Sequence, residues 1–285
     1  MKNIFYTFLL ITVLNIHINA QVQVNEGWNL IGATTTIQAS EVTTNPPGII
    51  ISSFYGFNSS YYVANTLEMG KGYWLKVSSN GTIYGFEPIF VCGETPINYG
   101  YKWYHTVQIG TQCWIKENLD VGTMIPGIPM TQQNNGVIEK FCYGDDETNC
   151  QLYGGIYQWN EAMQYDTTEG AQGICPPGWH IPTLADFQTL KATVNNDGNA
   201  LKALGQGSGA GAGTNTSGFS AFLSGRFTGI FQDFGIYGCI WLSKMEDPLE
   251  QTAHAFYLYD NNNSIFLYSG NYVYHRGYNI RCLKD

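Results

Sequence analysis

Charged residues are scarce in this sequence, and basic residues are the scarcest. Only 12% of the 285 residues are charged, and 22 acidic residues outnumber 13 basic ones, so the formal net charge is -9. A protein that holds nucleic acid by its phosphates needs clustered Lys and Arg to release counterions. The composition therefore argues against nucleic-acid binding.

Long apolar runs are also absent beyond the N-terminus. The one such run, residues 4–14, follows Lys2 and precedes a segment that ends in the small residue Ala20. It is too short to span a bilayer, which takes about twenty apolar residues, and it is typical of a signal peptide, residues 1–20, cut after Ala20. We therefore expect an exported protein, secreted or at the cell surface, that does not span a membrane.

Metal-ligand spacings are missing as well, since no Cys-x-x-Cys or His-x-x-x-His pair occurs. In an exported chain, cysteines are expected to form disulfides rather than a zinc site. An odd number leaves at least one cysteine unpaired within the chain. The seven cysteines are Cys92, Cys113, Cys142, Cys150, Cys175, Cys239 and Cys282.

No residue set typical of catalysis stands out. The glycine-rich run 205–213 lacks a following Gly-Lys-Ser/Thr, so a flexible surface loop is favoured over a phosphate cradle. The four histidines beyond the signal segment have no partner at a fixed spacing, and an oxidising compartment leaves few reactive thiols. We therefore predict that the protein is not an enzyme and needs no cofactor.

The length and a hydrophobic content of 44% indicate about two domains. Residues 21–91 contain short β-branched and aromatic runs separated by Gly, Asn, Ser and Pro, which predict a small all-β module. Its two tryptophan motifs, around Trp28 and Trp74, resemble a module of exported bacterial proteins. We interpret both tryptophans as buried anchors of a small sheet, and the alternative is a pair of sugar-stacking platforms.

Residues 92–99 are predicted to be a linker, and residues 100–285 a second domain. Within it, residues 153–165 have helical character, and Thr183-Leu-Ala-Asp186 predicts the start of another helix. From Gly218 onward, short strands and turns follow, with Asp260-Asn-Asn-Asn263 as one turn. Helices followed by an antiparallel meander predict an α+β fold.

The second domain resembles a known family, the Fibrobacter succinogenes major paralogous domain, over about residues 100–285. The resemblance implies a C-type-lectin-like fold, here with two helices and an antiparallel sheet, and no established reaction. It rests on Ile109-Gly-Thr-Gln-Cys-Trp114, Glu117-Asn-Leu119, Cys142-Tyr143, Cys150, Tyr153-Gly-Gly155, Tyr157, Trp159, Cys175-Pro-Pro-Gly-Trp-His-Ile-Pro-Thr183, Ser217-Gly-Phe-Ser-Ala221, Trp241 and Ile280-Arg-Cys282.

Two disulfides are predicted within this domain. Cys142 is expected to pair with Cys150, and Cys175 with Cys282, which would staple the ends of one compact module. Cys113 and Cys239 are atypical for the family, and each is free to pair with the other or with Cys92. These alternatives stay open at this point.

The segment between Cys142 and Cys150 carries Asp145, Asp146 and Glu147. Three carboxylates in one short closed loop are compatible with Ca²⁺. They also describe an ordinary solvated turn, which is the favoured interpretation, because the spacing of an EF-hand loop is missing.

Tyrosine and asparagine dominate the last thirty residues and form the candidate ligand-binding site. Tyr offers a large contact area at low entropic cost, and Asn offers adaptable hydrogen bonds. Residues 269–277, bounded by glycines, are expected to be an exposed loop, although strand alternation could bury half of the tyrosines. The predicted site residues are Tyr257, Tyr259, Asn261, Asn262, Asn263, Tyr268, Asn271, Tyr272, Tyr274, His275 and Tyr278.

The sequence thus predicts an exported binding or adhesion protein that recognises a cell-surface protein or glycan through these C-terminal loops. The alternative is a polysaccharide-binding accessory module that uses Trp and Tyr platforms. A glycan array and a pull-down on cell-surface proteins would separate the two hypotheses.

Overall fold

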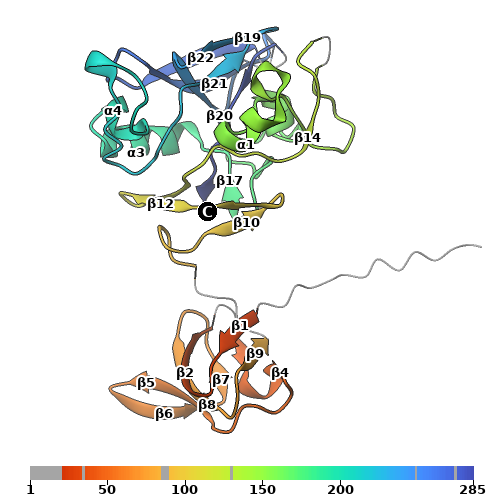
Figure 1. Cartoon of the computed structure of the whole chain (residues 1–285), viewed down its shortest axis with the longest axis vertical. Helices are drawn as coiled ribbons and strands as arrows, with labels where there is room; N and C mark the ends of the chain where they lie inside the picture. The colour runs from red at the N-terminus through yellow and green to blue at the C-terminus, as the bar shows by residue number, and fades with distance from the viewer. Residues whose placement is uncertain (1–20, 34–35, 85–89, 129–130, 248, 273–274) are drawn as a thin grey trace, which may run out of the picture. The chain divides into compact units, whose positions relative to one another are not determined.

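Two units of unequal size make up the chain, residues 1–90 and residues 91–285. A computed structural model describes residues 21–33, 36–84, 90–128, 131–247, 249–272 and 275–285 (Figure 1). The predicted signal peptide, residues 1–20, lies outside the described residues. In the part that is described, no helix is long and apolar enough to cross a membrane.

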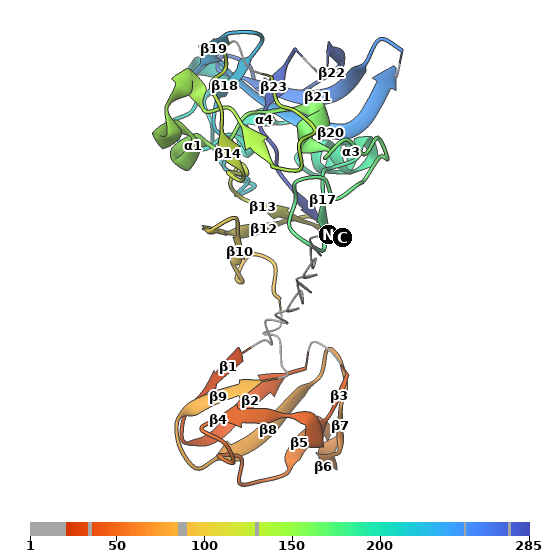
Figure 2. The same ribbon diagram turned by 90° about the vertical axis from the view of Figure 1, so that its right-hand side faces the viewer.

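The first unit is built from short strands, as the all-β prediction requires. Its sheets follow the orders β1-β9-β4 and β2-β8-β5-β6, and β3 pairs with β7 (Figure 2). The elements are β1 (Gln21–Val24), β2 (Gly27–Gly32), β3 (Ile37–Gln38), η1 (Ala39–Glu41), β4 (Thr43–Asn45), β5 (Phe54–Asn58), β6 (Ser60–Ala64), β7 (Thr66–Leu67), β8 (Gly72–Val77) and β9 (Gly81–Tyr84).

The core of the first unit forms where the inward sides of its strands meet. Successive residues of a strand point to opposite faces. On β8, this alternation buries Tyr73, Leu75 and Val77 and turns Trp74 and Lys76 outward. The buried hydroxyl of Tyr73 accepts a hydrogen bond from the backbone N–H of Glu68 at 2.7 Å. The core therefore has its own aromatic anchor, next in sequence to Trp74.

The second unit contains more strands and short helices. Its elements are β10 (Ile97–Tyr99), β11 (Lys102–Tyr104), β12 (Thr106–Ile109), β13 (Gln112–Ile115), β14 (Thr123–Met124), β15 (Glu139–Lys140), η2 (Tyr143–Asp145), α1 (Glu147–Tyr153), β16 (Tyr157–Gln158), α2 (Trp159–Ala162), β17 (Trp179–His180), α3 (Leu184–Thr193), α4 (Gly198–Leu201), η3 (Gly209–Gly211), β18 (Ser224–Phe227), β19 (Phe231–Phe234), β20 (Tyr237–Asp247), β21 (Thr252–Tyr259), β22 (Phe266–Tyr272), β23 (Gly277–Tyr278) and β24 (Leu283–Lys284).

Two sheets organise the second unit. The larger runs β16-β23-β18-β20-β21-β22, with β19 paired to β18, and the smaller runs β12-β13-β24-β17. In the smaller sheet, a strand near the start of the unit pairs with its last strand. The unit is thus mostly β with a few short helices, which is compatible with the α+β prediction.

Helix α3 begins where the capping pattern predicts. Thr183 caps the helix by accepting from the Asp186 backbone N–H at 3.1 Å, and the Asp186 carboxylate accepts from the Thr183 backbone N–H at 2.9 Å. The buried residues Phe187 and Leu190 face the large sheet, and the Phe187 ring stacks on Phe256 at 5.2 Å between centroids. The cap and this packing hold α3 against β21.

The two predicted disulfides are confirmed, Cys142–Cys150 and Cys175–Cys282, which are 8 and 107 residues apart in sequence. A third bond joins Cys92 to Cys113, which settles the pairing left open above. Cys239 is a buried free thiol, and its burial raises its pKa. The Cys92 bond also ties the start of the predicted linker, residues 92–99, to the second unit.

One local prediction in the second unit is wrong. The helix expected over residues 153–165 is interrupted, because α1 ends at Tyr153, Gly154 follows with φ +87°, and β16 intervenes before α2. The glycine run 205–213 lies at the surface, as predicted, with Gly205, Ser208 and Gly209 exposed, and it packs against the unit at Gly211. A Cβ on Gly211 would lie 2.2 Å from the carbonyl oxygen of Asp260, so glycine lets the run pack directly on the turn after β21.

Candidate functional site

One face of the sheet β2-β8-β5-β6 in the first unit is covered by aromatic and aliphatic side chains. Directly paired residues of neighbouring strands share a face. The register pairs Leu30 with Trp74, Trp74 with Tyr55, Tyr55 with Val63 and Phe57 with Tyr61. We call this surface the aromatic face; its members are Trp28, Leu30, Tyr55, Phe57, Tyr61, Val63 and Trp74.

Most of the aromatic face is open to solvent. The exposed fractions are 55% for Trp28, 60% for Leu30 and 65% for both Phe57 and Tyr61. Isolated exposed apolar residues are normal, but a contiguous set across four strands is not, and such patches mark binding surfaces. The hairpin of β5 and β6, which carries part of this face, projects from the unit (Figure 1).

Four members of the face enclose a hollow, which we call the aromatic hollow. Its volume is about 570 Å³, and it is lined by Trp28, Tyr55, Tyr61 and Trp74. The rings of Trp28 and Tyr55 have centroids 6.0 Å apart and planes inclined at 58°. The volume lies in the range of about 300 to 1,000 Å³ that is typical of ligand pockets.

Each residue that lines the aromatic hollow has a polar group that forms no hydrogen bond within the described part of the protein. Across the described part of the chain, neither the indole N–H groups of Trp28 and Trp74 nor the hydroxyls of Tyr55 and Tyr61 have a hydrogen-bond partner in the protein. Buried Trp and Tyr side chains usually find such a partner. These groups are therefore available to a ligand.

The interpretation of Trp28 and Trp74 as buried anchors is wrong. Trp28 is exposed, Trp74 is half-buried, and the buried positions on their strands belong to Ile31, Tyr73 and Leu75. Two adjacent aromatic residues, Tyr73 and Trp74, satisfy a strand pattern in either orientation. Only the second layer, β1-β9-β4, decides which of them is covered.

The predicted site in the second unit is partly buried. Tyr257 is 4% exposed and Tyr278 is 0% exposed, and their hydroxyls hydrogen-bond to each other at 2.5 Å. Burial raises the pKa of Tyr278 to about 12 and also raises that of Tyr257. Both side chains pack within the large sheet, so solvent hardly reaches their rings.

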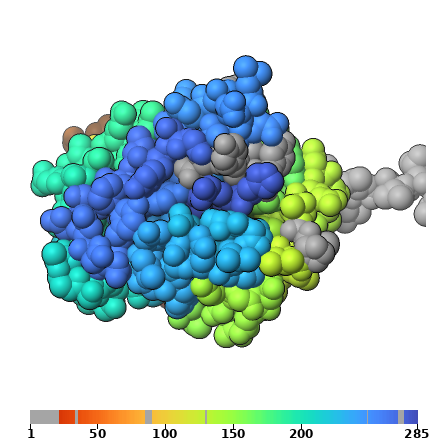
Figure 3. Space-filling view, turned by 90° about the horizontal axis from the view of Figure 1, so that it is seen from above, coloured from red at the N-terminus to blue at the C-terminus, as the bar shows by residue number. Residues whose placement is uncertain are grey.

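Other predicted residues do reach the surface. Tyr268 is 39% exposed, and its hydroxyl lies 2.6 Å from that of the half-buried Tyr259. Asn261 and Asn263 are exposed, and Asn262 is half-buried. Figure 3 shows the face of the second unit on which the C-terminal third, coloured blue, gathers.

A buried lysine, Lys202, holds the turn that carries these asparagines. The buried ammonium of Lys202 donates to the backbone carbonyls of Tyr259 and Asn262 at 2.7 and 2.9 Å, and also to that of Gly211. Desolvation by burial lowers the pKa of Lys202. The side-chain oxygen of Asn262 accepts from the Ser264 backbone N–H, so this asparagine has a structural task.

The segment expected to be an exposed loop, residues 269–277, is largely strand. β22 continues to Tyr272 and pairs Asn271 with Ala253 of β21, because the hydrogen-bonding ladder extends past Gly270. The side chains of Asn271 and Tyr272 lie outside the described part of the structure, as does all of Tyr274. His275 is exposed.

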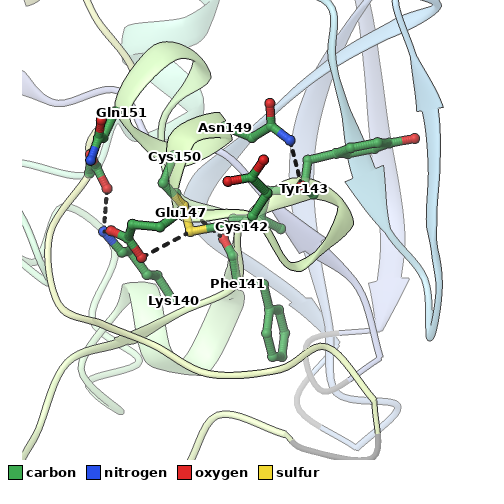
Figure 4. Close-up of a disulfide and its surroundings, with 12 residues drawn as sticks. Lys140, Phe141, Cys142, Tyr143, Glu147, Asn149, Cys150 and Gln151 are labelled. Carbon is green, nitrogen blue, oxygen red and sulfur yellow. Dashed lines mark hydrogen bonds and ion pairs between the residues drawn. A yellow bond between two sulfur atoms is a disulfide. The ribbon is translucent and has the colours of Figure 1, made fainter.

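The acidic loop between Cys142 and Cys150 surrounds the disulfide shown in Figure 4, where Asn149 donates to the Tyr143 carbonyl at 2.8 Å. Its carboxylates have separate partners. Asp145 accepts from the Gly127 backbone N–H at 2.8 Å, and Asp146 caps α1 through the Thr148 N–H at 2.9 Å.

The third carboxylate of that loop, Glu147, accepts from Lys140 at 2.7 Å. The same ammonium binds the buried Asp120 at 2.5 Å, so Lys140 lies between two carboxylates. Among the described residues, no group of three or more His, Cys, Asp and Glu side chains is arranged to hold a metal ion. Each of the three carboxylates thus has a partner within the protein.

A scan against protein families matches one model, the Fibrobacter succinogenes major domain, over residues 107–284. The match covers most of the second unit and agrees with the resemblance over about residues 100–285. A search of curated proteins found no match, and a search of solved structures found none either.

Proposed function

The chain belongs to the Fibrobacter succinogenes major domain family, and from this premise we propose that it is an extracytoplasmic binding protein that contacts its ligand through the aromatic face. The signal-peptide pattern and three disulfides support export. For the family unit, its short helix α3 and antiparallel strands β20 to β22 support the C-type-lectin-like fold that the resemblance implies.

The aromatic hollow is the observation that carries this proposal. Trp and Tyr each bury about 150 to 250 Å² when covered and are over-represented among residues that dominate binding energy. Leaving four of them around a hollow in water forfeits that stabilisation unless a ligand covers them. The unused indole and hydroxyl groups support recognition of a polar as well as an apolar ligand.

The proposal includes no catalysis. Buried carboxylates in the described residues serve the fold: Asp120 binds Lys140, and Glu161 accepts from the Glu139 backbone N–H at 2.9 Å and from the Tyr165 hydroxyl at 3.0 Å. Burial raises the pKa of Glu161. A general acid or base would need a free path to substrate.

A second binding surface is proposed on the second unit around Tyr259 and Tyr268, whose hydroxyls lie 2.6 Å apart. The exposure of Tyr268, Asn261, Asn263 and His275 favours it. Burial, followed by the hydrogen bond to Tyr268, raises the pKa of Tyr259, which keeps that hydroxyl neutral. This surface consists of those residues of the sequence-predicted binding site that solvent reaches.

The test is a glycan array together with a pull-down on cell-surface proteins, using the exported chain and its double variant Trp28→Ala/Tyr61→Ala. We expect hits that the double variant loses by tenfold or more in affinity, because truncating aromatic anchors removes most of an interface's binding energy. Met69→Ala is the control, since Met69 is 71% exposed in the same unit and does not line the aromatic hollow. Hits that persist in the double variant would move the binding surface to the second unit.

A further inference from the structure

We propose that the aromatic hollow holds a single, neutral glycan chain in solution, and not the flat surface of a crystalline polysaccharide. This inference rests on the proposed binding function of the aromatic face and assigns its ligand. It follows from the inclination of the rings, the size of the hollow, the charge of its walls and the free polar groups around it.

The inclination of the rings decides between a chain and a flat surface. A crystalline polysaccharide presents a plane, so a platform for it needs rings that lie in one plane. Here the planes of Trp28 and Tyr55 are inclined at 58°, and those of Phe57 and Tyr61 at 66° with centroids 5.2 Å apart. Rings at such angles form an uneven, hollowed surface instead of a plane, and a chain that lies in the hollow can contact more than one of them.

The hollow has room for part of a chain and opens onto further aromatic surface. Its volume of about 570 Å³ is that of a small-ligand site. Phe57 and Val63 lie on the same face, opposite Tyr61 and Tyr55 in the register. A chain that lies over Trp28 and Tyr55 can therefore continue over Tyr61 and Phe57.

The walls carry no charge, which favours a neutral ligand. All four lining residues are uncharged. The nearest charged position on the face is Lys76, which pairs with Trp28 in the register, and it is a single exposed lysine. An anionic polymer gains most from clustered basic side chains, and the face has no second one.

Sugar rings match both kinds of group in the hollow. A pyranose presents an apolar side of C–H groups, which packs against an aromatic ring by dispersion and removal of water. Its hydroxyls lie at the ring edge and both donate and accept hydrogen bonds. The free N–H groups of Trp28 and Trp74 and the free hydroxyls of Tyr55 and Tyr61 can meet them.

The experiment is titration calorimetry of the exported chain with soluble neutral hexasaccharides of β-1,4-glucose, β-1,4-xylose, β-1,3-glucose and β-1,4-N-acetylglucosamine. Oligogalacturonate is the anionic comparison, and pelleting with microcrystalline cellulose and chitin is the surface comparison. We expect at least one neutral hexasaccharide to bind, with affinity lowered tenfold or more by Trp28→Ala and by Tyr61→Ala. Met69→Ala should bind as the parent chain does, and neither solid should pellet the protein.

Several outcomes would overturn the inference. Pelleting without binding of soluble chains would mean a flat-surface platform, and preference for oligogalacturonate would mean an anionic ligand. A concentration-dependent dimer in sedimentation that Trp28→Ala abolishes would make the occupant a second copy of this chain. In another outcome, no saccharide binds, and the double variant Trp28→Ala/Tyr61→Ala no longer captures a protein that the parent chain captured in the pull-down. The assignment of a glycan ligand would then be wrong, but the aromatic face would remain the binding surface.

Discussion

Tryptophan serves opposite purposes in the two units. In the second unit, Trp159 and Trp241 are fully buried, and their indole N–H groups donate to the carbonyls of Leu242 and Tyr157 at 2.7 and 2.8 Å. In the first unit, Trp28 and Trp74 line an open hollow, and their N–H groups have no protein partner. The second unit buries Trp114, Trp159, Trp179 and Trp241 and leaves Trp103 exposed, whereas the first unit buries neither Trp28 nor Trp74.

The difference has a physical cause in the way each unit is stabilised. The second unit closes its chain with disulfides and packs large rings such as Trp114 and Phe219 edge to face at 5.5 Å. The first unit has no cysteine in its described residues and builds its core mainly from aliphatic side chains and Tyr73. Because that core is complete without Trp28, the tryptophan adds little to stability there and is free for binding.

The largest expected effect separates the units by their dependence on disulfides. Cys175–Cys282 closes a loop of about a hundred residues, worth roughly 4 to 5 kcal/mol in the chain-entropy model. We expect Cys175→Ser/Cys282→Ser to lower the unfolding free energy of the second unit by that order, measured by urea titration with tyrosine and tryptophan fluorescence. The transition of the first unit should not move, and a shift there of similar size would contradict the comparison.

The next effect compares two tryptophans directly. Trp241→Ala removes a buried ring 4.3 Å from that of Tyr278 and leaves the Tyr157 carbonyl without its donor, so we expect a loss of about 3 to 5 kcal/mol. Trp28→Ala should cost under about 0.5 kcal/mol, as exposed substitutions usually do. Both values come from urea denaturation. Equal losses in the two variants would mean that Trp28 belongs to a core.

The smallest effect concerns pH. Hydrogen bonds from His180 to Asp186 at 3.2 Å and to Asp285 at 2.7 Å raise the pKa of His180. Burial alone would raise the pKa of Asp186, but its hydrogen bonds to His180 and Thr183 outweigh burial and lower it to about 2. These contacts stabilise the second unit, because each favours the charged form of its partner.

The sign of the pH dependence follows from these shifts. The His180 contribution is fully present below its unfolded pKa of 6.5 and is lost as pH rises through the higher folded value. The Asp186 contribution is present above 3.8 and is lost as pH falls toward about 2. Thermal unfolding should therefore show the second unit losing up to about 1 kcal/mol between neutral and mildly alkaline pH.

Two separate His→Gln variants test whether His180 causes this slope of stability against pH. His180→Gln should flatten it, whereas His105→Gln, at a side chain that is 71% exposed, should not. The described residues of the first unit contain no histidine, so its stability should not change over the same range. A slope that persists in His180→Gln would assign the dependence to another group.

Several features of the fold could be predicted from residues close in sequence. The Thr183 and Asp186 spacing predicted the start of α3, because a capping box involves only neighbouring backbone groups. The short loop of Cys142 and Cys150 leaves few alternatives for pairing. The short β-branched and aromatic runs of residues 21–91, separated by turn-forming residues, predicted strands such as β8. Each of these depends on local geometry that the chain carries by itself.

The site could not be predicted in the same way. Tyr257 and Tyr259 occupy equivalent positions of one strand, yet one hydroxyl is buried against Tyr278 and the other lies beside the exposed Tyr268. The same holds for the pairing of Cys92, which depended on where β13 lies. Burial is set by the neighbouring strand or layer, and those neighbours are distant in sequence.

The amino-acid sequence by itself determined the family of the second unit, the two principal disulfides, the cap of α3 and the strand-forming character of the first unit. Only the tertiary structure decided that Trp28 and Trp74 face solvent while Tyr73 fills the core. The reason is that alternation along a strand defines two faces without saying which is covered. The second sheet, β1-β9-β4, covers one of them and leaves the aromatic hollow on the other.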